Sequence, residues 1–125
     1  MLPATLPADD LDNIDYIYMR RWQTLLAVDE LVDEVIEALE SLQLLDNTYI
    51  IFTSDNGYHM GQFAQGVDKR QPYDTDVRVP FIIRGPNIRP KSMLDTPIVL
   101  IDIFPTILDL ASKKLILLIS VKFKI

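Results

Sequence analysis

Two short apolar tracts, each closed by a glycine-containing turn, constrain the fold of this chain most. The first, Tyr49 to Phe52, is β-favouring throughout and precedes the turn sequence Asp-Asn-Gly. The second lies in "VPFIIRGPNI" (79–88) and stops at Gly85-Pro86. Strands that are apolar on both faces are typical of the middle of a parallel sheet covered by helices. The two tracts therefore predict strands of a mainly parallel sheet.

Helical periodicity precedes the first predicted strand. Within residues 15–43, apolar side chains recur every three or four positions, which predicts one long amphipathic helix. Asp12 or Asn13 is expected to cap this helix. Residues 1–14, rich in Pro and Asp, are interpreted as a loose lead-in.

The C-terminal part of the chain divides into a helix and a tail. A second helix is expected to begin near residues 101–103, with Pro105 tolerated in its first turn. Residues 112–125, "SKKLILLISVKFKI", form an apolar and basic tract unlike the rest of the chain. The order helix, strand, long loop, strand, helix predicts an α/β sandwich, with residues 15–111 as one domain.

Composition narrows the possible chemistry. The 125 residues contain no cysteine, which excludes disulfides, thiolate metal sites and a cysteine nucleophile within them. The net charge of −6 gives no reason to expect nucleic-acid binding. Apolar runs fall short of the ~18 residues of a transmembrane helix, so no membrane span is expected. The first residues have neither the basic start nor the apolar core of a signal peptide.

The segment "TSDNGYHMGQF" (53–63) gathers polar groups where the first strand ends. Open α/β sheets place ligand sites at the carboxyl ends of their strands. The Asp55 carboxylate and the Asn56 amide are hard oxygen donors, which suit Ca²⁺ or Mg²⁺. Asp-Asn-Gly is also a common turn sequence, so an ordinary turn is the alternative.

Three further side chains could belong to a site. His59, the only histidine, could act as a proton donor, as a ligand or as a surface residue. Lys69 and Arg70 could hold an anionic group, or could simply be solvated charges.

Taken together, these segments resemble the sulfatase family. The likeness is carried by "NTYIIFTSDNGYHMGQF" (47–63), "DKRQPYDTDVRVPFIIRGPNI" (68–88) and "VLIDIFPTILDLA" (99–111), in this order. Residues 20–40 also resemble the helix that precedes the motif strand in that family. Within the family, the likeness points to the subgroup that acts on glucosamine 6-sulfates of heparan-type glycosaminoglycans. It covers about residues 15–111.

The resemblance implies an alkaline-phosphatase-like α/β sandwich and hydrolysis of 6-sulfate esters of N-acetylglucosamine in heparan- or keratan-type glycosaminoglycans. Asp55 and Asn56 match two calcium ligands of the family. Lys69 matches the lysine that contacts the sulfate group and assists departure of the leaving oxygen. His59 matches a histidine beside the substrate, whereas no role is transferred to Arg70. The family also implies a lysosomal or secreted location.

The sequence departs from the family pattern at the nucleophile. In the family, a formylglycine made from the Cys or Ser of a Cys/Ser-x-Pro/Ala-x-Arg motif attacks sulfur, and residues 1–125 contain no such motif. The paired aspartates that complete the calcium site are also not found. We therefore expect this chain to be an incomplete, C-terminal part of the catalytic domain, with half of a calcium and sulfate site and no activity alone.

Two other functions stay open from the sequence. One is a non-catalytic module that binds anions or glycosaminoglycans through the basic second half of the chain. The other is a metal-dependent phosphoester hydrolase of the same superfamily. An incomplete sheet would also expose apolar strand edges at residues 50–52 and 81–83, which predicts a marginally stable fold.

Overall fold

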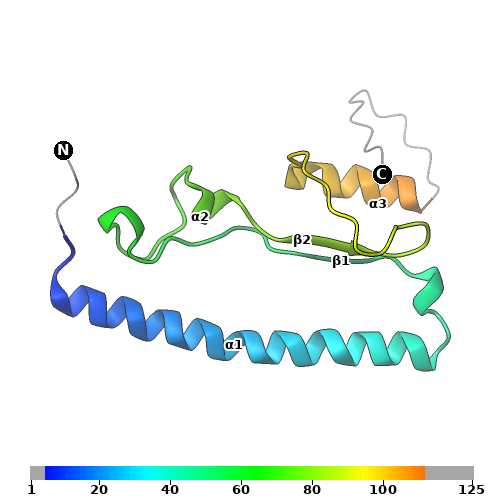
Figure 1. The fold of residues 1–125 in the computed structure, drawn as a ribbon, viewed down its shortest axis with the longest axis horizontal. Coiled ribbons are helices and arrows are strands. Elements are labelled where there is room, and N and C mark those ends of the chain that lie inside the picture. The colour runs from blue at the N-terminus through cyan, green and yellow to red at the C-terminus, as the bar shows by residue number, and fades with distance from the viewer. Residues whose placement is uncertain (1–4, 112–125) are drawn as a thin grey trace. The chain divides into compact units, whose positions relative to one another are not determined.

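The computed structural model describes residues 5–111. These residues divide into two compact units, of which the first ends at Pro86 and the second begins at Asn87. The tail expected over 112–125 lies outside the described residues. The elements in chain order are α1 (Ala8–Ser41), η1 (Leu45–Asn47), β1 (Ile50–Thr53), η2 (Gln62–Ala64), α2 (Asp74–Val77), β2 (Phe81–Arg84), η3 (Leu100–Asp102) and α3 (Ile103–Leu110) (Figure 1).

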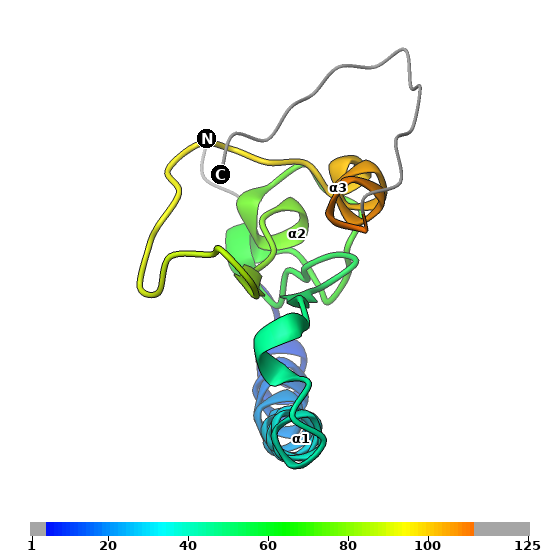
Figure 2. The same ribbon diagram turned by 90° about the vertical axis from the view of Figure 1, so that its right-hand side faces the viewer.

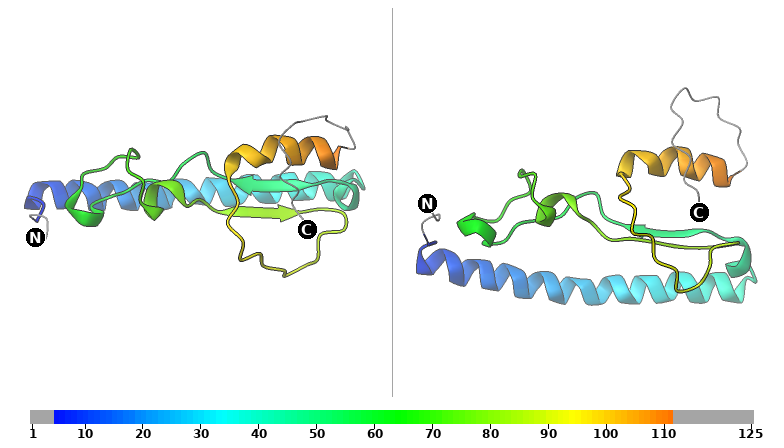
Figure 3. Two further views of the ribbon diagram at one scale, coloured as in Figure 1. Left: turned by 90° about the horizontal axis from the view of Figure 1, so that it is seen from above. Right: turned by 45° about the horizontal axis from the view of Figure 1, so that its top comes forward.

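The long helix predicted from the periodicity is confirmed as α1, which is continuous over 34 residues (Figure 3). It begins at Ala8, so the prediction of a loose lead-in is wrong for residues 8–14. Pro7 occupies the N-cap position with φ −56° and ψ 152°. Proline costs little there, because the first backbone N–H groups of a helix have no intrahelical acceptor.

The predicted cap of α1 at Asp12 or Asn13 is also wrong, because both residues lie inside the helix. Asp9 and Asp10 lie in its first turn. Carboxylates there interact favourably with the exposed N–H groups at the positive end of the helix dipole. This explains how an acidic stretch that reads as a loop can start a helix.

Little apolar surface is buried in the described part of the chain. Ile14, 8% exposed, is the one buried hydrophobic residue within residues 5–111. On the same helix Trp22 is 59% exposed and Leu26 is 64% exposed. Ile14 meets the loop after β1, where a Cβ on Gly61 would lie 3.5 Å from its Cδ1. The marginal stability expected from the sequence stays a prediction.

The two strands pair in antiparallel fashion, from Ile50 opposite Arg84 to Thr53 opposite Phe81. They lie side by side in Figures 2 and 3. Within residues 5–111 they form a two-stranded sheet, so the prediction of a mainly parallel sheet is wrong there. The connecting segment brings the start of β2 back to the end of β1, and an antiparallel pair needs no helical crossover.

The predicted stop of the second strand at Gly85-Pro86 is confirmed, and a close contact lies at this point. The Tyr49 ring packs on Gly85 so tightly that a Cβ there would lie 2.2 Å from Tyr49 Cδ1. The Tyr49 hydroxyl donates a hydrogen bond to the Pro86 carbonyl at 3.0 Å. Glycine is therefore required where the tyrosine before β1 crosses the end of β2.

The second unit contains η3 and α3. α3 begins at Ile103, so the expected start and the place of Pro105 in the first turn are both confirmed. The Thr106 hydroxyl donates a hydrogen bond to the Asp102 carbonyl at 2.6 Å. Within residues 5–111, no helix is both long enough and apolar enough to cross a membrane.

Candidate functional site

The turn after β1 is organised by its own side chains. The Ser54 hydroxyl donates to the Asn56 carbonyl at 2.9 Å, and the Asp55 carboxylate accepts the Asn56 backbone N–H at 2.9 Å. The Asn56 side-chain NH₂ donates to the Gly57 carbonyl at 2.8 Å. These bonds fix the amide of Asn56, so that its Oδ1 atom is free to face another group.

Gly57 brings this turn against α2. Its N–H donates to the Asp76 carbonyl at 2.8 Å. A Cβ on Gly57 would lie 2.0 Å from the Thr75 carbonyl oxygen, far inside contact distance. Only glycine fits where two backbone segments approach so closely. Gly57 therefore does more than end a turn, because it sets the distance between the turn after β1 and α2.

A backbone bridge places Lys69 beside the motif. His59 and Asp68 exchange two N–H···O bonds, of 3.0 and 3.2 Å, in an isolated antiparallel bridge. The Nζ atom of the next residue, Lys69, lies 2.9 Å from Asn56 Oδ1 and 5.5 Å from the centre of the Tyr58 ring. The structure thus brings together Asn56 and Lys69, which the sequence separates by 13 residues.

His59 is 3% exposed and is paired with Asp76, which is 4% exposed. Its Nδ1 atom lies 2.9 Å from both carboxylate oxygens of Asp76. The same carboxylate accepts the Gln71 backbone N–H at 2.8 Å and the Thr75 hydroxyl at 3.0 Å. The histidine is therefore a buried, oriented group and not a surface residue.

The pKa of Asp76 reflects this environment. Burial by itself raises the pKa of the carboxyl, but hydrogen bonds from Gln71, His59 and Thr75 act in the opposite direction, as does the attraction of the His59 imidazole when it is protonated. Their combined effect lowers the pKa of Asp76 below its ordinary value of 3.8. The carboxylate is thus ionised at neutral pH.

Asp76 was not singled out in the sequence. A buried histidine needs a hydrogen-bond partner, and several acids in this part of the sequence are candidates on spacing alone, among them Asp55, Asp68, Asp74 and Asp76. Asp74 instead forms an exposed pair with Arg78 at 3.7 Å. The fold brings Asp76 to His59, because Gly57 packs on the backbone of residues 75 and 76.

Arg70 lies apart from these contacts. Its side chain is 84% exposed, and its Nε atom lies 3.4 Å from the Asp68 carboxylate. The structure thus separates two neighbouring cations by environment, with Lys69 bound to Asn56 and Arg70 facing solvent.

The side chains of Asp55 and Asn56 offer oxygens of the kind that Ca²⁺ binds. Both are hard donors, and Asp55 is exposed. Within residues 5–111, no cluster of three or more His, Cys, Asp or Glu side chains suited to a metal is found. Ca²⁺ takes about six to eight oxygen ligands, so these two residues require additional ligands to hold the ion.

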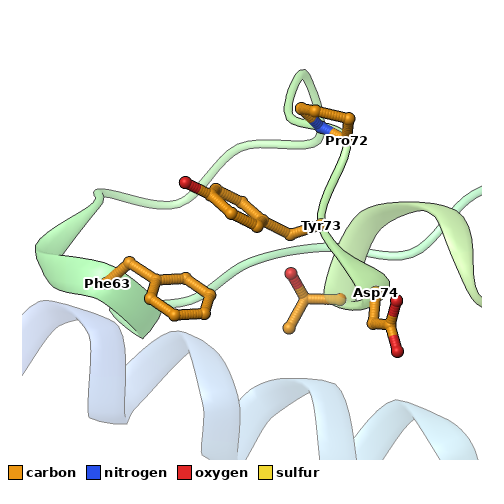
Figure 4. Close-up of a pocket in the computed structure, with 5 residues that line it drawn as sticks. Phe63, Pro72, Tyr73 and Asp74 are labelled. Carbon is orange, nitrogen blue, oxygen red and sulfur yellow. The ribbon is translucent and has the colours of Figure 1, made fainter.

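A cavity of about 380 Å³ lies beside α2, lined by Phe63, Pro72, Tyr73, Asp74 and Thr75 (Figure 4). The Phe63 and Tyr73 rings stack with centroids 4.6 Å apart and an interplanar angle of 28°. None of the four site residues expected from the sequence is among the lining residues.

Comparison with known proteins decides the family. The sequence model of the family described as Sulfatase matches residues 7–113. The chain belongs to the sulfatase family. The resemblance of the sequence to sulfatases is thereby confirmed, and the Asp-Asn-Gly turn, His59 and Lys69 all lie inside the matched segment.

Several curated sulfatases are similar to this chain. It is 50% identical to the human N-acetylglucosamine-6-sulfatase over 98 residues, which cover 78% of this chain and 18% of that protein. It is 47% identical over 91 residues to the Drosophila melanogaster extracellular sulfatase SULF-1 homolog, covering 73% of this chain and 8% of that protein. A Volvox carteri arylsulfatase is 45% identical over 114 residues, which cover 85% of this chain and 17% of that protein.

The chain therefore matches less than a fifth of the length of these relatives. No solved structure matches it.

Proposed function

We propose that this sulfatase chain supplies part of the site that binds and hydrolyses a sulfate ester. The expected substrate is the 6-sulfate of N-acetylglucosamine in heparan- or keratan-type glycosaminoglycans. The human relative that is 50% identical carries the name N-acetylglucosamine-6-sulfatase, which supports this substrate class. As in the family, a lysosomal or secreted location is expected.

The contact between Lys69 and Asn56 carries the proposal. The ammonium of Lys69 lies 2.9 Å from the amide oxygen of Asn56, the residue that follows Asp55 in the chain. A cation and a hard oxygen donor thus meet at one place from two separate sequence motifs. A sulfate ester needs both kinds of group: oxygens to hold a divalent cation and a positive charge for the sulfuryl oxygens.

Each residue then has a specific role. Lys69 binds a sulfate oxygen and stabilises the negative charge that develops as the ester bond breaks. Asp55 and Asn56 provide two oxygen ligands for Ca²⁺, which when bound supplies a Lewis acid for the sulfate group. His59, in the loop that follows β1, lies beside the sugar and contacts it. The further metal ligands and the formylglycine nucleophile come from outside residues 1–125, so we expect this chain to be inactive alone.

A chimera tests this proposal. Residues 8–111 replace the matching segment of the human N-acetylglucosamine-6-sulfatase, and hydrolysis of N-acetylglucosamine 6-sulfate is measured. We expect measurable kcat/KM for the chimera and a loss of about 10²- to 10³-fold for Lys69→Ala, the scale for removing one group that stabilises transition-state charge. Asn56→Ala should raise the calcium concentration needed for half activity.

The matched control is Arg70→Ala, which removes the neighbouring, solvent-facing cation. Its kcat/KM should stay within about twofold of the parent chimera, as is usual for exposed charges. Equal losses for Lys69→Ala and Arg70→Ala, or activity of the Lys69→Ala chimera equal to its parent, would contradict the proposal.

A further inference from the structure

We propose that Asp76 is a positioning residue that holds neutral His59 in the Nδ1–H tautomer and so makes its Nε2 atom a hydrogen-bond acceptor. The group recognised by Nε2 would be a hydroxyl or N–H donor of the bound sugar. The identity of this ligand rests on the proposed function, whereas the tautomer does not.

The hydrogen bond between His59 and Asp76 has a defined direction. Nδ1 of His59 lies 2.9 Å from both oxygens of Asp76. An ionised carboxylate has only acceptors, so the proton in this contact must lie on the imidazole. The carboxylate is ionised because the Gln71 N–H and the other donors lower the pKa of Asp76 despite its burial. In the neutral ring the other nitrogen, Nε2, then carries a lone pair.

The Asp76 carboxylate is held in place and cannot turn away from His59. The Gln71 N–H holds one carboxylate oxygen and the Thr75 hydroxyl holds the other. The backbone carbonyl of Asp76 accepts the Gly57 N–H at 2.8 Å. With His59 and Asp76 only 3% and 4% exposed, water has little access to compete for the contact. Such a fixed carboxylate determines both the tautomer and the orientation of a histidine.

Lys69 and His59 would therefore bind different parts of the substrate. The Lys69 ammonium has only donors, so it suits the anionic sulfate oxygens. The Nε2 atom of a neutral Nδ1–H histidine can only accept, so it would be repelled by those oxygens and would favour a donor on the sugar. His59 would then recognise the sugar, and Lys69 would bind the sulfate group.

NMR spectroscopy of the 125-residue chain tests the inference directly. His59 is the sole histidine, so ¹⁵N labelling gives the signals of a single imidazole ring. At pH 7.5 we expect Nδ1 to carry the proton in most molecules, opposite to the preference of free histidine. A majority of the Nε2–H tautomer, or of the doubly protonated ring, would overturn the proposal.

Two variants assign the effect to Asp76. In Asp76→Asn the carboxamide can donate as well as accept, so the Nδ1–H form should lose its majority. Asp74→Asn is the matched control, because it removes an acid of the same helix whose side chain is 84% exposed. It should leave the tautomer ratio unchanged. An unchanged ratio in Asp76→Asn, or an equal shift in Asp74→Asn, would overturn the role of Asp76.

This readout needs no turnover, which keeps the two proposals separable. An inactive chimera, together with the Nδ1–H tautomer in the 125-residue chain, would contradict the sulfatase role alone. An active chimera, together with the Nε2–H tautomer in the 125-residue chain, would contradict only the role of Asp76.

Discussion

The Nζ atom of Lys69 lies 2.9 Å from Oδ1 of Asn56, although the two residues belong to different sequence motifs. The contact exists because His59 and Asp68 pair through their backbones and set the two motifs side by side. It joins the cation expected to bind sulfate to an oxygen expected to bind calcium.

Gly57→Ala should destabilise the loop that carries the site. The added Cβ would lie 2.0 Å from the Thr75 carbonyl oxygen, and backbone atoms cannot move aside as a flexible side chain can. A forced contact of this kind costs about 1–3 kcal/mol. Chemical denaturation measures the free energy of unfolding of the 125-residue chain.

Gly66→Ala is the control for this substitution. Among the described residues, no atom lies within 4 Å of a Cβ at Gly66. Alanine should be neutral there or should stabilise by about 0.4–1 kcal/mol, because it restricts the unfolded chain. Equal destabilisation by both substitutions would show that the contact between Gly57 and Thr75 is unimportant.

The contribution of Asp76 to stability should depend on pH. Its carboxyl has a pKa below the ordinary 3.8 in the folded chain, so folding favours the ionised form. The stabilisation is therefore complete well above pH 3.8 and is lost as the pH falls through that value and then through the lower pKa of the folded state. The difference in unfolding free energy between the wild type and Asp76→Asn should shrink over this range.

Denaturant titrations at a series of pH values measure that difference. Asp74→Asn again controls for the loss of an acid from α2. A difference between the wild type and Asp76→Asn that grows toward acidic pH would contradict the predicted sign.

The 125-residue chain should not hydrolyse sulfate esters by itself. It contains no formylglycine precursor motif, and loss of a covalent nucleophile removes the mechanism rather than a factor in its rate. A fluorogenic aryl sulfate with added calcium provides the assay, with Lys69→Ala as the background. Turnover above that background would show the expectation of inactivity to be wrong.

Heparin chromatography separates the catalytic proposal from a purely anion-binding role. With a net charge of −6 and Lys69 engaged by Asn56, we expect weak retention that ends below physiological salt. Strong retention that falls with salt, and falls further in Lys69→Glu and Arg70→Glu, would instead favour a glycosaminoglycan-binding module.

The sequence by itself determined the local elements and the family. Periodicity predicted the long helix, the two apolar tracts predicted β1 and β2, and Pro105 marked the first turn of α3. The family was readable because its motifs are short, ordered and contiguous, and the sulfatase match confirmed it. These features depend on neighbouring residues, so they are present in the order of the chain.

Strand direction and the pairing of polar groups were decided by the tertiary structure alone. An apolar tract such as Ile50–Thr53 has the same composition whichever way its partner runs, so the antiparallel pairing could not be read from it. Likewise, nothing in the sequence singles out Asp76 as the partner of His59, which the docking of Gly57 on residues 75 and 76 brings close to it. The start of α1 at Ala8 shows the same limit, because Pro and Asp suit both a loop and the first turn of a helix. In the first two cases the deciding contacts join segments that are distant in sequence, whereas at the start of α1 the local sequence is compatible with both a loop and a helix.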